Sequence, residues 1–261
     1  MCATCGCGDV EHEPAPHEAA PGHMHSHGHD HQHEHGHDHE HGRTIRLERQ
    51  VLERNDRIAE RNRGWFESRG ICALNLVSSP GAGKTTLLER SLRELGKELR
   101  LHVIEGDQET SADADRIRAA GGRAVQINTG TGCHLDAAMV AQALPKLDAP
   151  PGSTLFIENV GNLVCPALFD LGERAKVLIA SVAEGEDKPL KYPHMFRAAA
   201  VLVLNKIDLL PHLDFDEERF LSNARQVNPR LRVFRVSAAR GDGLPAWCAW
   251  VREQQGTRDV A

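Results

Sequence analysis

The chain has 261 residues, a formal net charge of −6 and seven cysteines. Residues 1–42 carry eight acidic side chains and no Lys or Arg, so the remainder is close to neutral and offers no basic surface for nucleic acid. No apolar run approaches the roughly 18 residues that cross a bilayer. We therefore expect a cytoplasmic protein that binds neither nucleic acid nor membranes, with thiols that bind metals instead of forming disulfides.

Residues 1–42 are predicted to form a Cys/His-rich metal-binding tail. Cys2, Cys5 and Cys7 lie close to a free α-amine, and Gly6 eases the turn between them. Three thiolates and an amine suit Ni²⁺ in a planar site or Zn²⁺ in a tetrahedral one. The polar tract that follows has histidine at every second position, which predicts disorder in the absence of metal. Its histidines are His23, His25, His27, His29, His31, His33, His35, His37, His39 and His41.

The segment 43–70 predicts an amphipathic helix that leads into the core. Apolar residues recur there at intervals of seven on a strongly charged background. They are Ile45, Leu52, Ala59 and Phe66, with Val51, Ile58 and Trp65 beside them. Because the polar face mixes both signs and the apolar seam is short, we expect the seam to pack on the domain or on a second copy of the chain, and not on a membrane.

Residues 71–257 alternate apolar runs with helical patterns, which predicts one domain. Continuous apolar runs are typical of strands that are covered on both faces, so the predicted fold class is α/β, with a doubly wound, mostly parallel sheet. Ligands of such sheets bind at the carboxyl ends of the strands. The predicted strands are 71–77, 101–105, 124–127, 154–157, 175–180, 201–204 and 231–236.

Residues 78–86 read Ser-Ser-Pro-Gly-Ala-Gly-Lys-Thr-Thr, the phosphate-loop pattern with Ser in place of its first glycine. Gly81 and Gly83 let backbone amides turn toward phosphates, Lys84 reaches the β and γ oxygens, and the Thr85 hydroxyl binds Mg²⁺. A glycine-rich turn without a ligand is disfavoured, because strand, loop and helix follow in the order that a phosphate site requires. The predicted nucleotide-binding residues here are Gly81, Gly83, Lys84, Thr85 and Thr86.

A second nucleotide motif, Asn205-Lys206-Ile207-Asp208, follows the sixth predicted strand and matches the guanine-reading NKxD pattern. The Asp208 carboxylate can accept hydrogen bonds from N1 and N2 of guanine, and adenine lacks this pair of donors. The motif therefore predicts a preference for GTP over ATP. Ser237 and Ala238, after the last predicted strand, resemble the loop that backs the guanine ring.

Between these motifs, residues 155–161 read Leu-Phe-Ile-Glu-Asn-Val-Gly and resemble the second switch of GTPases. Glu158 is predicted to hold Mg²⁺ through water, and the amide of Gly161 to sense the γ-phosphate. Asp107 either faces the same Mg²⁺ or attacking water, or forms the first turn of a helix. Residue 162 is Asn, where many GTPases use Gln to orient water, so slow turnover is predicted. The predicted catalytic residues are Lys84, Asp107, Glu158 and Gly161.

A second set of metal ligands is predicted near the nucleotide end of the sheet. Cys133 and His134 follow the third predicted strand, and Cys165 stands four residues beyond Gly161. Chance adjacency of a buried thiol and a surface imidazole would explain Cys133 and His134 alone. Cys165 favours a metal site, whose affinity would depend on the nucleotide if the segment after Gly161 moves. The two remaining cysteines are predicted to be core residues; they are Cys72 and Cys248.

Six motifs together closely resemble the HypB family, the GTPases that help insert nickel into [NiFe]-hydrogenases: CxxCGC, SSPGAGKTT, EGDQ, TGCH, ENVGNLVCP and NKID. The resemblance spans nearly the whole chain. It implies a SIMIBI-class G domain that dimerises with GTP, a high-affinity nickel site at the three N-terminal cysteines, and a weaker nickel or zinc site at Cys133, His134 and Cys165 in the dimer interface. It also implies a HypA-like partner, a hydrogenase large-subunit precursor as recipient, and nickel storage on the histidines.

The predicted function is a GTP-hydrolysing metallochaperone that stores nickel and delivers it to the hydrogenase large subunit. UreG, the urease nickel GTPase, shares the phosphate loop, but CxxCGC and the absence of a Gly-Gly-Asp stretch in the second switch argue against it. A nickel buffer that acts through its histidines is a second alternative. A third, an ATPase that carries electrons or metal clusters, is disfavoured by NKID. Thiolate and imidazole ligands leave the choice between nickel and zinc open.

Overall fold

The computed structural model describes residues 38–107, 112–130 and 132–256, with the backbone alone for 38–48. The chain divides into two units, Met1–Val51 and Leu52–Ala261, and the contacts below belong to the second unit. The predicted disorder of the tail lies outside the described part for residues 1–37, and it is wrong for residues 38–42, which begin the helix Asp38–Ser68. The predicted metal ligands of the tail also lie outside the described part; they are Cys2, Cys5, Cys7, the histidines from 23 to 37, and the side chains of His39 and His41.

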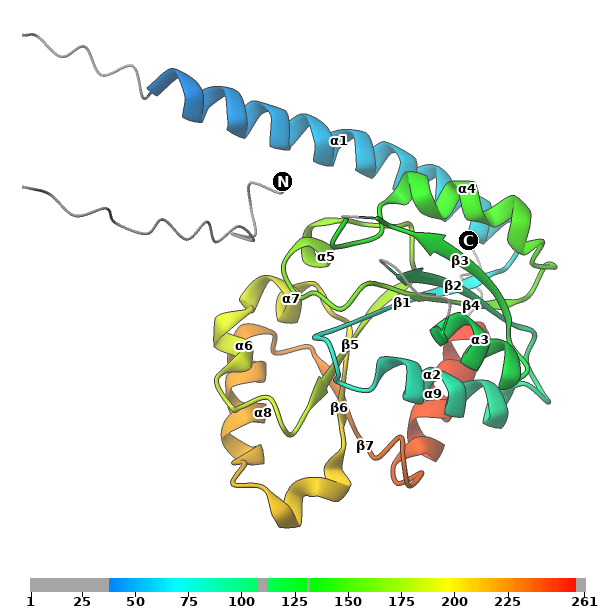
Figure 1. Ribbon diagram of the computed structural model, residues 1–261, viewed down its shortest axis with the longest axis vertical. Coiled ribbons are helices and arrows are strands. Elements are labelled where there is room, and N and C mark those ends of the chain that lie inside the picture. The colour runs from blue at the N-terminus through cyan, green and yellow to red at the C-terminus, as the bar shows by residue number, and fades with distance from the viewer. Residues whose placement is uncertain (1–37, 108–111, 131, 257–261) are drawn as a thin grey trace, which may run out of the picture. The chain divides into compact units, whose positions relative to one another are not determined.

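Seven strands form one sheet in the order β3-β2-β4-β1-β5-β6-β7 (Figure 1). Every pairing is parallel, which confirms the predicted doubly wound sheet. The chain leaves β1 toward one edge and returns through β4 to build the other edge, so the carboxyl end of β1 lies where the strand order reverses. The strands are β1 Cys72–Ser78, β2 Leu101–Asp107, β3 Arg123–Asn128, β4 Thr154–Glu158, β5 Ala175–Ser181, β6 Val201–Asn205 and β7 Arg232–Val236.

Helices cover both faces of the sheet (Figure 1). On one face Leu87 and Trp247 pack with Leu74, and on the other Phe196 packs with Val77. Because β1 is buried along its whole length, its residues alternate between these two cores. The helices of the second unit are α2 Lys84–Leu95, α3 Ala112–Ala119, α4 Ala137–Leu147, α5 Cys165–Leu168, α6 Lys188–Lys191, α7 Pro193–Ala198, η1 Ile207–His212, α8 Glu217–Val227 and α9 Leu244–Gly256.

Helix α1 spans Asp38–Ser68 and precedes β1. In its C-terminal part, Ala59 and Phe66 of the predicted seam are buried, but so are Asn55 and Asn62 on the same side. Asn62 Nδ2 donates to the carbonyls of Ala137 and Leu171, at 2.9 and 3.1 Å. The packed side of this helix is therefore partly polar, and two asparagines connect it to the loops that flank the metal-ligand motifs.

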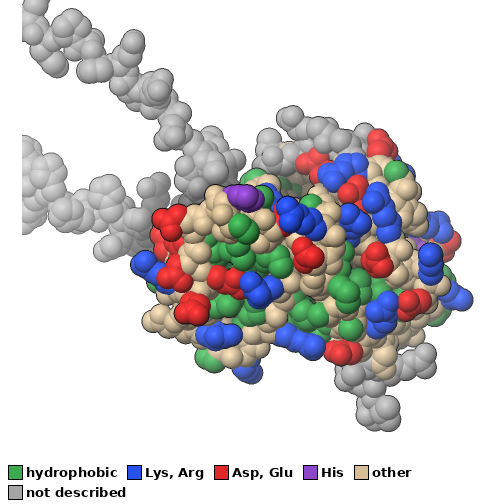
Figure 2. Space-filling view, turned by 90° about the horizontal axis from the view of Figure 1, so that it is seen from below, with side chains coloured by type: hydrophobic (Ala, Val, Ile, Leu, Met, Phe, Trp, Pro, Cys, Tyr) green, Lys and Arg blue, Asp and Glu red, His purple; other side chains and the backbone are tan. Residues whose placement is uncertain are grey.

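The surface carries charges of both signs. Figure 2 shows Lys, Arg, Asp and Glu side chains interspersed around apolar side chains on one face of the molecule. Within the described ranges, no helix combines the length and the apolar character that crossing a membrane requires.

Candidate nucleotide and metal site

The loop between β1 and α2 forms the wall of a cavity of about 540 Å³ at the carboxyl ends of β1, β2 and β4. This is the position at which parallel sheets bind ligands. The cavity brings together all the residues predicted for phosphate, Mg²⁺ and catalysis. They are Gly81, Gly83, Lys84, Thr85, Thr86, Asp107, Glu158 and Gly161, joined by Glu105, Asp113 and Lys206.

Glycine is required at two positions of the phosphate loop. Gly81 and Gly83 have φ angles of +73° and +95°, a region that other residues rarely adopt. A Cβ atom on Gly83 would also lie 2.4 Å from Nδ2 of Asn205. A Cβ on Gly161 would lie 3.1 Å from the backbone nitrogen of Pro80, so the predicted switch approaches the phosphate loop closely. The loop and the switch therefore form adjacent walls of one cavity.

Lys84 and Thr85, the first two residues of α2, both reach the end of β4. Thr85 Oγ1 lies 2.7 Å from Glu158 Oε1 and 3.1 Å from Asp113 Oδ2, and its one hydrogen can be donated to only one of them at a time. Lys84 Nζ lies 3.4 Å from Glu158 Oε1. Asp113, in the first turn of α3, was not among the predicted site residues. A carboxylate in the first turn of the helix after a strand was the available signal for it.

Four carboxylates crowd this side of the cavity: Glu105, Asp107, Asp113 and Glu158. Burial, and then the neighbouring carboxylates, raise the pKa of Glu105 to about 8. Burial also raises the pKa of Glu158, opposed mainly by the charge of Lys84. One buried oxygen of Glu105 and one of Glu158, both Oε2, have no hydrogen-bond partner. Mg²⁺ prefers oxygen ligands such as carboxylates, and these two oxygens have no other partner, so Glu105 and Glu158 fit a bound Mg²⁺. Glu105 was also missing from the predicted site.

The predicted base-reading residues lie beside the phosphate loop and are hydrogen bonded to it. Asn205 Nδ2 donates to the Ala82 carbonyl at 2.9 Å, and Asn205 Oδ1 accepts from the Ala238 amide at 3.0 Å. Lys206 Nζ donates to the Gly81 carbonyl at 2.7 Å. One asparagine therefore joins the phosphate loop to the loop that contains Ser237 and Ala238, both of which are buried.

Asp208 has the properties of a guanine acceptor. A hydrogen bond from Ser237 lowers its pKa, so the carboxylate is charged near neutral pH. Its Oδ1 atom is buried and has no hydrogen-bond partner. A buried carboxylate oxygen without a donor is costly unless a ligand supplies one, and the N1 and N2 donors of guanine would do so.

The predicted metal ligands Cys133, His134 and Cys165 lie together. Their ligand atoms are all within 4.8 Å of one another, and the two Sγ atoms are 3.2 Å apart. Burial lowers the pKa of His134, which favours the neutral imidazole that binds metals, and its ring packs on Phe169. Two thiols and a neutral imidazole suit nickel or zinc. The other two described cysteines, Cys72 and Cys248, are buried core residues, as predicted.

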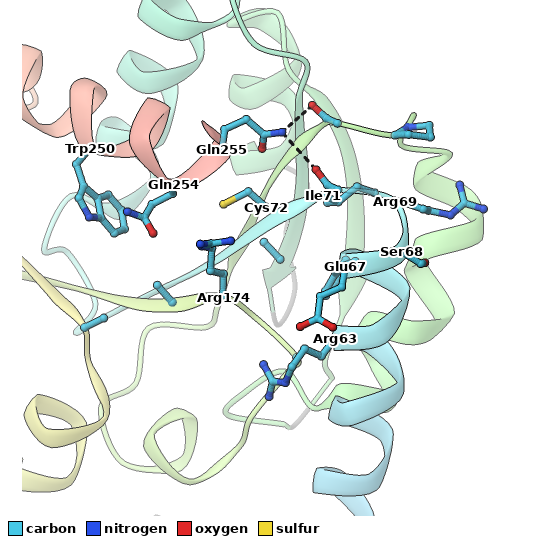
Figure 3. A pocket seen from close by; sticks show the side chains of 18 of the residues that line it. Arg63, Glu67, Ser68, Arg69, Ile71, Cys72, Arg174, Trp250, Gln254 and Gln255 are labelled. Carbon is cyan, nitrogen blue, oxygen red and sulfur yellow. Dashed lines mark hydrogen bonds between the residues drawn. The ribbon is translucent and has the colours of Figure 1, made fainter. Parts of the chain in front are cut away.

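A second cavity, of about 1230 Å³, lies at the amino ends of the strands and contains none of the predicted site residues. Figure 3 shows Gln255 of α9 bridging to the start of β1, with Arg174 pointing into the cavity and Arg63 at its edge. Gln255 Nε2 donates to the carbonyls of Gly70 and Gly152, at 3.3 and 3.0 Å. Gln255 thus connects helix α9 to the residues just before β1 and to those just before β4.

The sheet and the loop after β1 define the class: a P-loop nucleotide-binding protein with a thiol and imidazole cluster beside its phosphate cavity. Residues 72–235 match the family model for the CobW/HypB/UreG nucleotide-binding domain. The hydrogenase maturation factor HypB of Azotobacter vinelandii is 51% identical, over 99% of this chain and 94% of the relative. The chain belongs to the HypB family of hydrogenase maturation factors.

Two solved structures are similar to this one. The crystal structure of HypB from Archaeoglobus fulgidus has a TM-score of 0.73 and 38% identity, and covers 78% of this chain and 99% of its own. The crystal structure of HypB from Helicobacter pylori in complex with nickel has a TM-score of 0.73 and 37% identity, and covers 78% of this chain and 95% of its own. The family predicted from the sequence motifs is thereby confirmed.

Proposed function

We propose that this protein is a GTP-hydrolysing nickel metallochaperone, in which the bound nucleotide controls transfer of nickel to the large-subunit precursor of a [NiFe]-hydrogenase. One observation carries the proposal. The segment from Glu158 to Gly161 lines the phosphate cavity, and Cys165 of the metal cluster follows it by four residues. A change in the position of this segment on loss of the γ-phosphate would move one metal ligand relative to the other two.

Hydrolysis is assigned to residues that already face the cavity. Lys84 would neutralise the β and γ oxygens, and the Gly161 amide would donate to the γ-phosphate. Thr85, Glu158 and Asp107 would hold Mg²⁺, which supplies charge neutralisation when bound. Slow turnover follows from Asn162, because its Oδ1 accepts from the Val164 amide at 2.7 Å and is engaged in that local turn. No glutamine follows the switch glycine to orient water.

The base is assigned as guanine. Asp208 Oδ1, buried and without a donor, matches the N1 and N2 donors of guanine, whereas adenine would leave it unsatisfied. Asn205 and Lys206 would hold the base-reading loop against the phosphate loop through their bonds to its carbonyls. Ser237 and Ala238 would pack behind the guanine ring. GTP would therefore bind more tightly than ATP.

The remaining parts of the proposal come from the sequence and the family. We assign residues 1–42 to nickel binding, at Cys2, Cys5 and Cys7 and on the histidines; 43–70 to the leading helix; and 71–257 to the GTPase domain. The HypB of Helicobacter pylori crystallised with nickel, which supports nickel as the cargo. Zinc would compete for the same thiol and imidazole ligands. The partners are a HypA-like chaperone and a GTP-promoted second copy, in the cytoplasm.

The test measures nickel release from the full chain to excess chelator, with GDP or with a non-hydrolysable GTP analogue bound. Cys165→Ser serves as the matched control, because it removes a ligand of the cluster and leaves the tail ligands in place. The proposal expects release that depends on the nucleotide in the wild type and not in Cys165→Ser. Equal release rates in the two nucleotide states of the wild type would refute it.

A second candidate, a nickel buffer without a role for GTP, is favoured by the ten histidines between residues 23 and 41. It expects that deletion of residues 23–41 abolishes hydrogenase maturation in cells, whereas Lys84→Ala leaves maturation intact. The first proposal expects the opposite ranking, with Lys84→Ala the more damaging change.

A further inference from the structure

Four polar side chains lie buried between the nucleotide cavity and the metal cluster. We call them the polar bridge: Asn75, Asn159, Glu173 and Lys176, exposed by 0, 1, 8 and 8%. Burying polar and charged groups costs free energy unless each is hydrogen bonded, and apolar residues would pack such a region at lower cost. The cost of burying these four groups indicates that the polar bridge has a role other than packing.

One end of the polar bridge joins the switch to the metal loop. Asn159 lies between Glu158 and Val160, within the segment that lines the phosphate cavity. Its Oδ1 atom accepts from the Val160 amide and from the Leu135 amide, both at 3.0 Å. Leu135 follows His134 directly. One side-chain oxygen thus holds the switch and the Cys133–His134 loop at the same point.

The other end holds the turn that contains Cys165. Lys176 Nζ donates to the carbonyls of Pro166 and Phe169, at 2.8 and 3.1 Å, and lies 3.6 Å from Glu173 Oε1. Pro166 follows Cys165, so Lys176 fixes the short helix α5 on which that thiol lies. Both halves of the metal cluster are therefore anchored to the same buried bridge.

The two ends are connected through β1. Asn75 Nδ2 donates to Glu173 Oε1 at 3.0 Å, and Asn159 Nδ2 donates to Asn75 Oδ1 at 3.4 Å. A carboxylate only accepts hydrogen bonds, so Glu173 fixes which way the Asn75 amide faces. Asn75 in turn fixes the amide of Asn159, and turns its oxygen toward Leu135 and Val160. The bridge therefore has one hydrogen-bonding arrangement when the switch is in this position.

We propose that the polar bridge is the coupling element of this protein: it converts the position of the Glu158–Gly161 segment into the separation of Cys133 and Cys165. This inference rests on the proposed function, since it explains how nucleotide and metal affinity are linked. Displacement of Asn159 breaks its bond to Leu135, which frees the Cys133–His134 loop from the switch, or its bond to Asn75, which disconnects the switch from the residues that hold the Cys165 turn. Metal affinity depends steeply on ligand placement, and the two Sγ atoms are already 3.2 Å apart. The four residues are positioning residues.

The test breaks the bridge at Asn75, which lines neither the nucleotide cavity nor the metal cluster. Full-length protein is held at fixed free Ni²⁺ in a chelator buffer, with GDP or a non-hydrolysable GTP analogue. Nickel binding at the cluster is followed as protection of Cys133 from alkylation, with the Cys133 peptide resolved by mass spectrometry. The alkylation rate of Cys133 without nickel gives a second readout, independent of loaded metal.

The midpoint is the free Ni²⁺ concentration at which Cys133 is half protected from alkylation. In the wild type we expect the midpoints with GDP and with the GTP analogue to differ at least about 5-fold, the lower end of typical coupling between sites. In Asn75→Ala we expect the ratio to fall below about 2-fold, with nucleotide affinities unchanged, because coupling is lost while both sites remain. Asn228→Ala is the matched control: it removes side-chain bonds to the carbonyls of Phe196 and Ala199, outside the bridge. It should keep the wild-type ratio.

The outcomes separate the two proposals. Equal midpoints in the wild type would refute nucleotide control of the metal, and with it the proposed function. A wild-type ratio that persists in Asn75→Ala would overturn the role of the bridge and leave the proposed function standing. Thermal unfolding checks that each variant folds. Asn75→Leu, which is similar in size and can neither donate to Glu173 nor accept from Asn159, takes over if Asn75→Ala does not fold.

Discussion

The two sides of the nucleotide cavity differ in how their polar groups are satisfied. On the base side, Asn205 and Lys206 are hydrogen bonded to the backbone of the phosphate loop, and Asn205 also binds the Ala238 amide. On the cation side, Glu105 and Glu158 each keep a buried oxygen without a partner, and both have raised pKa values.

This difference suggests two tasks for the cavity under the proposed function: one side selects the base, and the other senses the bound cation and phosphate. Apart from Asp208 Oδ1, which lacks a donor, the base side is assembled by hydrogen bonds that need no ligand, so under the proposed function it would select guanine before any conformational change. The cation side crowds four carboxyl groups whose charged forms Mg²⁺ would stabilise, so its energy depends on what is bound. The segment that leads to Cys165 belongs to the cation side, so the half of the cavity that is proposed to respond to the nucleotide is the one connected along the chain to the metal cluster.

The largest effect is expected from disabling the cation side at Lys84. Lys84→Ala removes the ammonium proposed to neutralise the phosphate oxygens, and GTP hydrolysis should fall on the order of 100- to 1000-fold, as when a group that stabilises the transition state is lost. Single-turnover phosphate release measures it. Lys97→Ala, a change at an exposed lysine beyond α2, should leave the rate unaltered. A Lys84→Ala rate within a few-fold of the wild type would contradict the assignment.

The next largest effect concerns the base side alone. Asp208→Asn removes the charge from an acceptor of two hydrogen bonds and turns one of its oxygens into a donor, so it should weaken GTP binding on the order of 100-fold. Xanthosine triphosphate, whose C2 carbonyl can accept from the new amide, should bind the variant more tightly than GTP does. Competition against a fluorescent nucleotide measures both. An unchanged preference for GTP would show that the base is read elsewhere.

The features that could be predicted from the sequence are those with a local signature. The strands follow from continuous apolar runs, and the phosphate loop follows from glycines placed between a strand and a helix. Glu105 joins the site because β2 pairs with β4, and Asp113 joins it because α3 packs against α2; Asn75 contacts Glu173 across 98 positions of sequence. Contacts between distant segments have no periodic pattern, so the polar bridge could be found only in the structure.

A third prediction concerns the excess carboxylates of the cation side. The pKa of Glu105 is raised from 4.5 to about 8, so between these pH values the folded chain retains a proton that the unfolded chain releases. Without divalent cations, stability should therefore fall as the pH rises from about 4.5 to about 8. Glu105→Gln should flatten this decline and raise the melting temperature at pH 8, by roughly 2–4 °C for each kcal/mol relieved.

Thermal unfolding in EDTA between pH 5 and pH 9 tests this expectation. Glu94→Gln, at an exposed position of α2, should retain the wild-type pH dependence. Parallel curves for the wild type and Glu105→Gln would mean that the Glu105 carboxyl titrates near its ordinary pKa and that the cation side is not strained.

The smallest effect should come from loosening the base side without touching the nucleotide. Arg90 of α2 donates from Nε to the Ala238 carbonyl at 3.1 Å and from Nη2 to the Ala239 carbonyl at 2.7 Å. Arg90→Ala removes both bonds, each worth about 1 kcal/mol to folding, and only part of that loss should reach the ligand, so GTP affinity should fall about 3-fold. Arg93→Ala, at an exposed position of the same helix, is the control for fluorescence titration. Both bonds of Arg90 go to backbone carbonyls and not to any of the four carboxylates, so the Mg²⁺ concentration that gives half-maximal hydrolysis should not change in Arg90→Ala; a shift there would mean that the two sides are not independent.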